Sequence, residues 1–255
     1  MHYQTCPSCG YRRQAQDAAP VGVCPSCGLV FEKWLRRRLV VETEPQPESV
    51  DERLSESWSW LRARIFAIPE STDELSFYGR LATYLLFFFW GWHFIWLDMS
   101  SGAIGASFMH NVNLVFHESG HVIFRPFGWL MTVLGGSLMQ LLVPMVVMGA
   151  FLFREGNAFG ASIGLWWLAQ SLMDLAPYIN DARAQELMLL GGGTGTDMPG
   201  MHDWNNILGY LGLLAQDHRI AVFIDTLGET LMLVALFWGA WLLLEMQRRR
   251  GRSTR

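Results

Sequence analysis

The sequence predicts an all-α protein in which a polytopic helical membrane domain, with about four to six membrane segments, follows a small cysteine-rich module. Long apolar runs dominate the chain from Leu81 onward, and all four cysteines lie before residue 28. Hydrophobic residues make up 51% of the 255 residues and charged residues only 16%, whereas soluble domains carry about 25% charged residues. This composition excludes an ordinary soluble enzyme, and it equally excludes a disordered or collagen-like chain.

The apolar runs are long enough to act as membrane spans. A bilayer core about 30 Å thick requires roughly 20 apolar residues of helix, and residues 81–97 meet this length with Trp and Tyr as interfacial anchors. A membrane-embedded domain is therefore expected over residues 80–246. Its further candidate spans are residues 127–153, 159–178 and 220–244, with a shorter run at 107–124.

Basic residues flank the apolar region on both sides. Arg36–Arg38, Arg62 and Arg64 precede it, and a basic tail at residues 247–255 follows it. The positive-inside rule then places both termini in the cytoplasm and requires an even number of crossings. The number stays open, because residues 107–124 and 205–214 can each cross or re-enter. The formal net charge of −4 argues against nucleic acid as the main partner.

Residues 36–79 connect the two regions. Residues 39–58 are acidic and contain prolines, so they are expected to form a linker. Residues 59–70 mix basic and aromatic residues and are expected to be a short amphipathic helix on the membrane surface, or simply the start of the membrane domain.

The cysteine-rich module contains an internal repeat. Cys6-Pro7-Ser8-Cys9-Gly10 recurs as Cys24-Pro25-Ser26-Cys27-Gly28. Two such C-x2-C knuckles together supply four thiolates in the tetrahedral arrangement that suits Zn²⁺. The spacing resembles that of zinc ribbons, so residues 1–35 are expected to be a ribbon with a structural zinc ion. A closed four-thiolate site has no open position for chemistry.

A second metal-binding pattern lies in the run at 107–124. His117-Glu118-Ser119-Gly120-His121 is an HExxH motif. On a helix, residues i and i+4 share a face, so both imidazoles can bind one Zn²⁺ while Glu118 serves as the general base for a water molecule. A catalytic zinc ion also needs a third ligand.

Several residues are candidates for that ligand. Pro177 can kink its helix and make room for an anionic side chain, which favours Asp181 and leaves Asp174 as an alternative. His202 and Asp203 follow a glycine-rich segment that can fold back over the metal. His110 can share the face of His117 but is expected to have a packing role. The sequence around His93 and His218 indicates no functional role for either residue.

The arrangement resembles the site-2 protease family of intramembrane zinc metalloproteases. His117, Glu118 and His121 match its first motif residue by residue, whereas Asp174-Leu175-Ala176-Pro177 followed by Asp181 only approximates its Asn-x-x-Pro element and the Asp after it. The resemblance covers residues 106–185. It implies a zinc ion bound by His117, His121 and Asp181, Glu118 as the catalytic base, and transmembrane proteins as substrates.

The expected protein is therefore an integral, multi-pass membrane zinc metallopeptidase with one catalytic and one structural zinc ion. Two alternatives stay open, a non-catalytic membrane scaffold with structural zinc and a metal transporter. The transporter alternative rests on the acidic residues of the membrane domain, Asp98, Asp174, Asp225 and Glu229. Asp225 and Glu229, an i, i+4 pair, can also form a proton relay or support the metal ligands.

Overall fold

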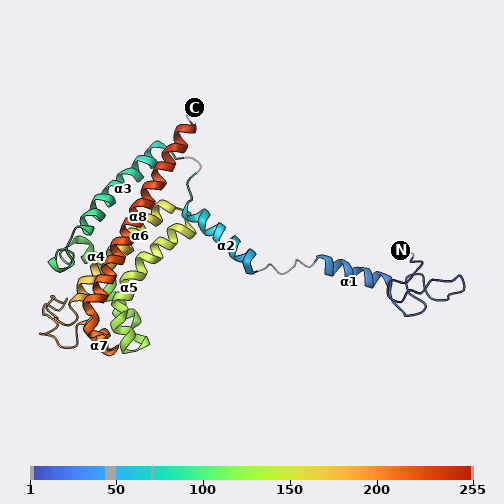
Figure 1. Cartoon of the computed structure of the whole chain (residues 1–255), viewed down its shortest axis with the longest axis horizontal. Coiled ribbons are helices and arrows are strands. Elements are labelled where there is room, and N and C mark those ends of the chain that lie inside the picture. The colour runs from blue at the N-terminus through green and yellow to red at the C-terminus, as the bar shows by residue number, and fades with distance from the viewer. Residues whose placement is uncertain (1–2, 44–49, 70–71, 254–255) are drawn as a thin grey trace. The chain divides into compact units, whose positions relative to one another are not determined.

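The structure is a computed structural model that describes residues 3–43, 50–69 and 72–253 (Figure 1). It divides into two compact units, Met1–Ser59 and Trp60–Arg255. Among the described residues the secondary structure is helical, with isolated β-bridges and no strand. The all-α prediction is confirmed for this part of the chain.

The first unit repeats one knuckle twice. In each, the first cysteine donates its N–H to the carbonyl five residues on, Cys6 to Tyr11 and Cys24 to Leu29, both at 2.9 Å. Gly10 and Gly28 close the turns with φ of 73° and 70°, a left-handed conformation that favours glycine. The internal repeat of the sequence is thus also a repeat of backbone geometry.

Two helices lie around the boundary between the units, the first wholly within the first unit and the second containing the boundary itself. Helix α1 is Phe31–Thr43 and helix α2 is Val50–Ile65. The predicted linker over residues 39–58 is therefore helical at both of its ends. Its centre, residues 44–49, lies outside the described residues, as do the last two residues of the basic tail. A helix covers the first part of the predicted amphipathic helix at 59–70, but it begins and ends earlier.

The second unit is a bundle of long helices. Helices α3 (Glu74–Ile95), α4 (Phe108–Phe124) and α5 (Trp129–Gly149) are followed by a π-helical turn, η3 (Ala150–Arg154). The chain continues through α6 (Ala158–Asn180), the short α7 (Asp203–Tyr210) and α8 (Asp217–Ser253). Three short 3-10 turns join them, η1 (Met99–Ser101), η2 (Arg125–Phe127) and η4 (Leu214–Gln216).

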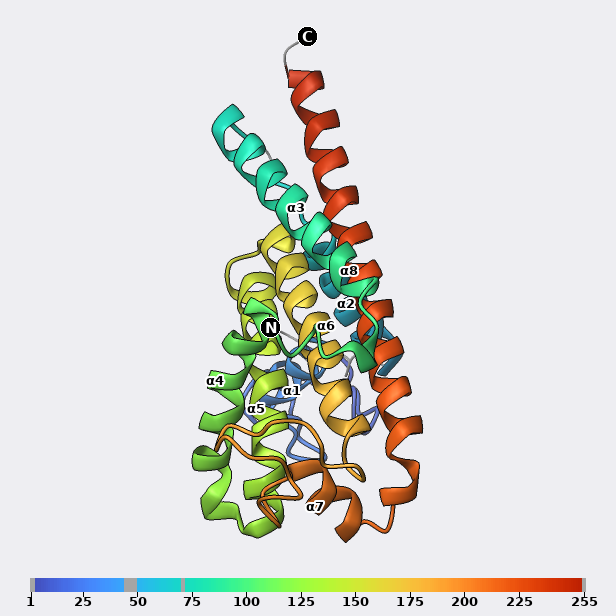
Figure 2. The same cartoon turned by 90° about the vertical axis from the view of Figure 1, so that its left-hand side faces the viewer.

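Helix α6 is the internal helix of this bundle. It packs most extensively against α8 and also contacts α5, α3 and α4, and Figure 2 shows it running between α5 and α8. The main core cluster joins α3, α4, α6 and α8 through Phe94, Met109, Trp166 and Met232. Because α6 is covered on most sides, its polar residues face other helices.

Two helical stretches are long and apolar enough to cross a bilayer, Trp129–Arg154 and Leu214–Gly251. Only 28% of the most apolar 18-residue part of each stretch is buried within the protein, unlike the core helix of a soluble protein. The expected spans at residues 81–97 and 159–178 do not pass the same criterion. The first is interrupted by Trp, Tyr and His, and the second carries buried polar residues of α6.

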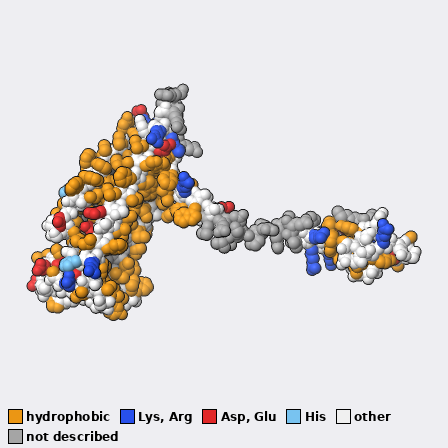
Figure 3. All heavy atoms as spheres, viewed as in Figure 1, with side chains coloured by type: hydrophobic (Ala, Val, Ile, Leu, Met, Phe, Trp, Pro, Cys, Tyr) orange, Lys and Arg blue, Asp and Glu red, His pale blue; other side chains and the backbone are white. Residues whose placement is uncertain are grey.

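The surface of the helical bundle is rich in apolar side chains, as Figure 3 shows for one face. Exposed residues include Phe89 on α3, Val122 on α4, Val146 on α5 and Phe237 on α8, with exposed fractions of 68%, 72%, 67% and 72%. Large contiguous apolar surfaces of this kind are rare on soluble monomers.

Helices α4 and α5 approach each other closely over glycines. A Cβ on Gly120 would lie 2.1 Å from the carbonyl oxygen of Gly135, and one on Gly135 would lie 2.7 Å from the carbonyl oxygen of Gly120. Only a residue without a side chain allows this backbone contact. Gly120 stands inside the HExxH motif, so the same contact holds that motif against α5.

Replacing Gly120 by Ala is expected to destabilise the bundle by about 1–3 kcal/mol, since the new methyl group meets backbone that cannot move aside. The measurement is the thermal unfolding midpoint in detergent. Gly79→Ala on α3 is the matched control, because a Cβ there has no heavy atom within 4 Å. Equal midpoints for the two variants would contradict the close helix contact.

Candidate metal centres

The four cysteine sulfurs form the first candidate metal centre. Sγ of Cys6 lies 3.7 Å from that of Cys27, and Sγ of Cys9 lies 3.7 Å from that of Cys24. All four sulfurs lie within 4.8 Å of one another, and none is in a disulfide. A tetrahedral zinc ion with Zn–S bonds of about 2.3 Å separates its sulfurs by about 3.8 Å. The set therefore fits a tetrahedral metal ion.

The knuckle backbone also stabilises thiolates. Burial opposes ionisation of Cys6, but the backbone N–H groups of Cys9 and Ser8 and the neighbouring thiols lower its pKa from 9.0 to about 6. Metal binding requires deprotonated sulfur. The turn thus favours the thiolate at Cys6, whereas hydrogen bonds with the other three thiols and burial raise the pKa of Cys27 to about 12.

Replacing Cys6 by Ser is expected to remove one zinc ion per chain and to unfold the first unit, because so small a unit depends on its metal. Zinc content by mass spectrometry should fall from two ions to one, with a gain of protease-sensitive sites before residue 36. Ser8→Ala is the control, since Ser8 contributes only its backbone. Unchanged zinc content in the Cys6 variant would contradict the ribbon site.

The second candidate centre joins two helices of the second unit. His117 and His121 lie one turn apart on α4, and Asp203 is the first residue of α7. Asp203 Oδ2 lies 3.1 Å from His117 Nε2 and 3.2 Å from His121 Nε2. All three ligand atoms lie within 4.8 Å of one another. The His117 side chain is 8% exposed, that of Asp203 13% and that of His121 23%.

Hydrogen bonds fix which ring nitrogens face this centre. His121 Nδ1 donates to the carbonyl oxygen of Thr132 at 2.8 Å. His117 Nδ1 donates to Gln140 Oε1 at 3.1 Å. A neutral imidazole protonated at Nδ1 presents a lone pair at Nε2. Both Nε2 atoms therefore face one carboxylate oxygen, so that a metal ion, or in its absence a proton carried by the rings, holds the three atoms together.

The geometry of the three atoms fits zinc. Tetrahedral zinc with bonds of about 2.0–2.2 Å to nitrogen and oxygen separates neighbouring ligand atoms by about 3.3 Å. The observed nitrogen–oxygen distances of 3.1 and 3.2 Å are close to that value. Three protein ligands leave a fourth position open, which is typical of catalytic zinc sites.

Gly136 on α5 makes room for the two rings. A Cβ at this position would lie 2.6 Å from Nε2 of both His117 and His121. Any larger residue here would push the coordinating nitrogens aside. The glycine pair Gly135–Gly136 thus has two roles, helix contact and space for the metal centre.

Asp203 is positioned by its own helix start and by Tyr178. The Tyr178 hydroxyl accepts from the Asp203 N–H at 2.9 Å and donates to Asp203 Oδ2 at 3.3 Å. Burial would raise the pKa of Asp203, but the hydrogen bonds with His117 and His121 hold it below its usual value. The carboxylate is therefore in the ionised form that binds a cation.

Within the described residues, the predicted third ligand Asp181 lies outside the groups that could hold a metal ion. Its two carboxylate oxygens accept the backbone N–H groups of Glu186 and Leu187, both at 2.9 Å. Oδ2 also receives His202 Nε2 at 3.2 Å. These bonds hold the loop that follows α6, and they engage both oxygens of the Asp181 carboxylate. The group that could hold a metal ion contains Asp203 where the sequence predicted Asp181.

His202 likewise lies outside the described groups that could hold a metal ion, although it directly precedes Asp203. Its Nδ1 accepts the N–H of Asn205 as the N-cap of α7, and its Nε2 donates to Asp181. Both nitrogens are thus occupied. Burial lowers the pKa of His202, in keeping with a neutral ring that packs on Tyr178 at a centroid distance of 4.4 Å.

The remaining candidates lie outside the metal-ligand group. Asp174 belongs to a buried polar network and accepts from His110 Nδ1 at 2.9 Å. Asp225 and Glu229 lie half-buried on α8, where Asp98 also acts electrostatically on Asp225. His218 contacts Asn180, and His93 is exposed on α3. Within the described residues, none of these acids joins a group that could hold a metal ion.

Glu118 lies half-buried beside His117 on α4. Its carboxylate acts electrostatically on both His121 and Tyr178. The general base expected from the motif is thus near the ligands.

No protein-family model matches this chain, and neither the curated proteins nor the solved structures include a match. The two ligand sets themselves are therefore the basis for any functional assignment.

Proposed function

We propose that this protein is an intramembrane zinc metallopeptidase that hydrolyses peptide bonds of membrane-associated substrates. The observation that carries the proposal is the convergence of His117 Nε2, His121 Nε2 and Asp203 Oδ2, with Glu118 beside them on the same helix. This is the donor set of a catalytic zinc site, with two imidazoles, one carboxylate and an open fourth position.

Each residue then has a defined role. When bound, zinc would act as a Lewis acid that polarises a peptide carbonyl and lowers the pKa of a water molecule. Glu118 accepts a proton from the attacking water and returns it to the leaving amine, so that one water is consumed per bond cleaved. Thr132 and Gln140 hold the two rings, and Tyr178 holds Asp203.

We further propose that the second unit spans the bilayer several times, with about four to six segments and both termini in the cytoplasm. Helix α5 with η3 and helix α8 with η4 supply the two stretches of sufficient length and hydropathy. The apolar surface of α3 and α4 supports additional segments. The basic residues Arg248–Arg250 at the end of α8 favour a cytoplasmic terminus.

The likeness to site-2 proteases stays a hypothesis carried by His117, Glu118 and His121. The proposed third ligand differs from the one that the resemblance implies, because Asp203 lies after α6 on a separate short helix. The four-cysteine unit is expected to stabilise its own fold or to dock a partner, because its metal set is closed.

The test uses the full chain in proteoliposomes with a set of single-span peptides that contain Gly or Pro. Cleavage in ¹⁸O-labelled water, read by mass spectrometry, should place one ¹⁸O in each new carboxyl group. Removal of metal with 1,10-phenanthroline should abolish cleavage, and added Zn²⁺ should restore it.

Two results would overturn the proposal. One is cleavage that persists after the metal is removed. The other is the absence of cleavage across the peptide set with zinc bound at both sites, which would favour the non-catalytic scaffold.

A further inference from the structure

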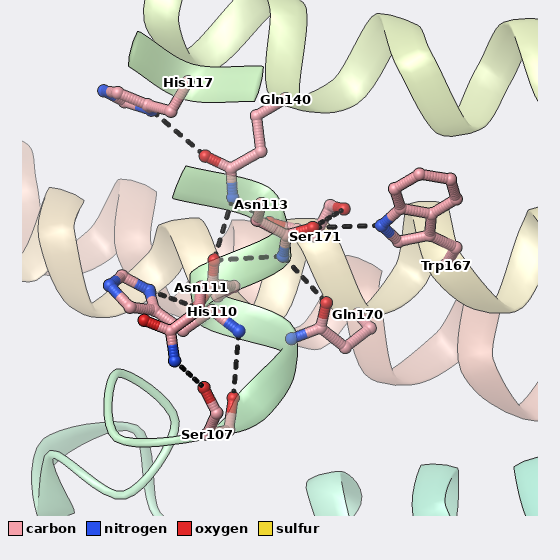
Figure 4. Close-up of polar contacts among 10 residues, drawn as sticks. Ser107, His110, Asn111, Asn113, His117, Gln140, Trp167, Gln170 and Ser171 are labelled. Carbon is pink, nitrogen blue, oxygen red and sulfur yellow. Dashed lines mark hydrogen bonds and ion pairs between the residues drawn. The ribbon is translucent and has the colours of Figure 1, made fainter. Parts of the chain in front are cut away.

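A buried chain of polar side chains leads away from the metal centre into the helical bundle. His117 Nδ1 donates to Gln140 Oε1 at 3.1 Å, and Gln140 Nε2 donates to Asp174 Oδ2 at 3.0 Å. Figure 4 shows Gln140 reaching from α5 between His117 and the residues around Asn113. Gln140 is 4% exposed and Asp174 is 7% exposed. The catalytic scheme above gives Asp174 no role.

Asp174 determines which way the Gln140 amide points. A carboxylate only accepts hydrogen bonds, so the NH₂ group of Gln140 must face it. The carbonyl oxygen of Gln140 then faces His117 and can only accept from it. This places the proton of the neutral ring on Nδ1 and leaves the Nε2 lone pair for the metal.

Asp174 is itself held in place. Oδ1 lies 2.9 Å from His110 Nδ1, and Oδ2 also accepts from Asn113 Nδ2 at 3.1 Å. Asn113 in turn accepts from Trp167 Nε1 at 3.0 Å, and Figure 4 shows Trp167 and Ser171 directed toward Asn113. The carboxylate therefore has donors on both oxygens and a fixed orientation.

We infer that Gln140 and Asp174 are positioning residues that set the tautomer of His117 and so the zinc affinity of the membrane centre, the centre formed by His117, His121 and Asp203. Gln140 contacts the ligand directly, and Asp174 acts through Gln140, one hydrogen bond further from the ligand. The inference rests on the metal site of the proposed function, but it does not require peptide hydrolysis.

The experiment compares two buried glutamines of the same network. Gln140→Met and Gln170→Met both remove a buried amide, but only Gln140 contacts a metal ligand. Gln170 Oε1 accepts from Asn113 at 2.8 Å, and within the described chain its Nε2 has no hydrogen-bond partner. Zinc affinity is measured by competition with a chelator in the Cys6→Ser background, so that only the membrane centre is titrated.

Gln140→Met is expected to weaken zinc binding about 10- to 100-fold, the usual effect of losing the partner of a metal-bound histidine. Gln170→Met should bind zinc as the parent does. Asp174→Asn should also weaken binding, but adding it to Gln140→Met should cost nothing further, because Asp174 acts through Gln140. Parent-like affinity of Gln140→Met, or fully additive losses, would overturn the inference.

An isosteric pair covers the case in which Gln140→Met does not fold. Gln140→Glu alone places two carboxylates against each other. Combining Gln140→Glu with Asp174→Asn instead puts an amide donor opposite the new carboxylate, which still accepts from His117. Zinc affinity should fall in the single variant and recover in the double variant. Absence of recovery would contradict the chain of hydrogen bonds.

A spectroscopic readout tests the tautomer directly. The ¹⁵N shifts of His117 in metal-free protein should show Nδ1 protonated in the parent and in Gln170→Met. In Gln140→Met the Asp203 carboxylate is the remaining partner of the ring, so the proton should move from Nδ1 to Nε2. A parent that keeps this tautomer and binds zinc but cleaves no peptide would refute the proposed function and leave the positioning inference standing.

Discussion

Glu118→Gln is expected to lower the rate of peptide hydrolysis at least about 100-fold while zinc content stays at two ions per chain. General bases commonly contribute 10²- to 10⁴-fold, and an amide cannot accept the proton of the attacking water. Gln is nearly isosteric with Glu, and Glu118 is outside the ligand group. The measurement is the initial rate of ¹⁸O-labelled product formation, with zinc quantified on the same sample.

The control for this variant is Glu186→Gln. Glu186 is exposed in the loop after α6, and the structure uses its backbone N–H rather than its carboxylate to hold Asp181. The Glu186→Gln variant should therefore cleave peptides at the rate of the parent. Equal activity of Glu118→Gln and the parent would end the enzymatic interpretation and leave a membrane protein with two metal sites.

The parts of the sites that are local in sequence could be predicted. The C-x2-C knuckles and the HExxH turn are each set by hydrogen bonds within about six residues, so spacing alone brings their ligands together. The all-α class follows equally from long apolar runs without strand alternation. The structure agrees with these predictions where its residues are described.

The third ligand depends on contacts that spacing does not encode. Asp203 reaches His117 over 86 residues, through a glycine-rich loop whose return path is fixed by Asp181 and His202. The sequence signal for Asp203 is its place directly after a residue that can cap a helix, since His202 is the N-cap of α7. The helix start aims the Asp203 carboxylate at α4.

Helix boundaries and span number are harder to predict from the sequence. The acidic, Pro-containing segment at 39–58 predicts a linker, yet Val50–Ile65 forms a helix in which Trp60 stacks on Phe153. That contact is tertiary and overrides the local signal. In α6, apolar length favours a span, but Gln170, Ser171 and Asp174 face the interior of the bundle.

Asp203→Asn and Asp181→Asn are expected to give opposite results. Asp203→Asn removes the charge from the ligand set, and zinc affinity of the membrane centre should fall by more than the 10- to 100-fold that outer partners cost. Asp181→Asn should keep zinc affinity near that of the parent. It should lower stability by about 1–3 kcal/mol, because the amide NH₂ of Asn cannot accept the hydrogen bonds that Oδ2 receives from the Leu187 N–H and His202 Nε2.

The two variants separate a ligand from a residue that holds the loop. Zinc affinity by chelator competition and the thermal midpoint of the metal-free protein are measured on both. Asp181 holds His202 and the loop rather than the metal. Without added zinc, Asp181→Asn should therefore have a lower thermal midpoint than the parent, but the folded variant should still bind zinc. If Asp181→Asn instead weakened zinc binding and left the thermal midpoint of the metal-free protein unchanged, Asp181 would be a ligand. Only a direct ligand alters zinc affinity while the metal-free fold stays as stable as the parent.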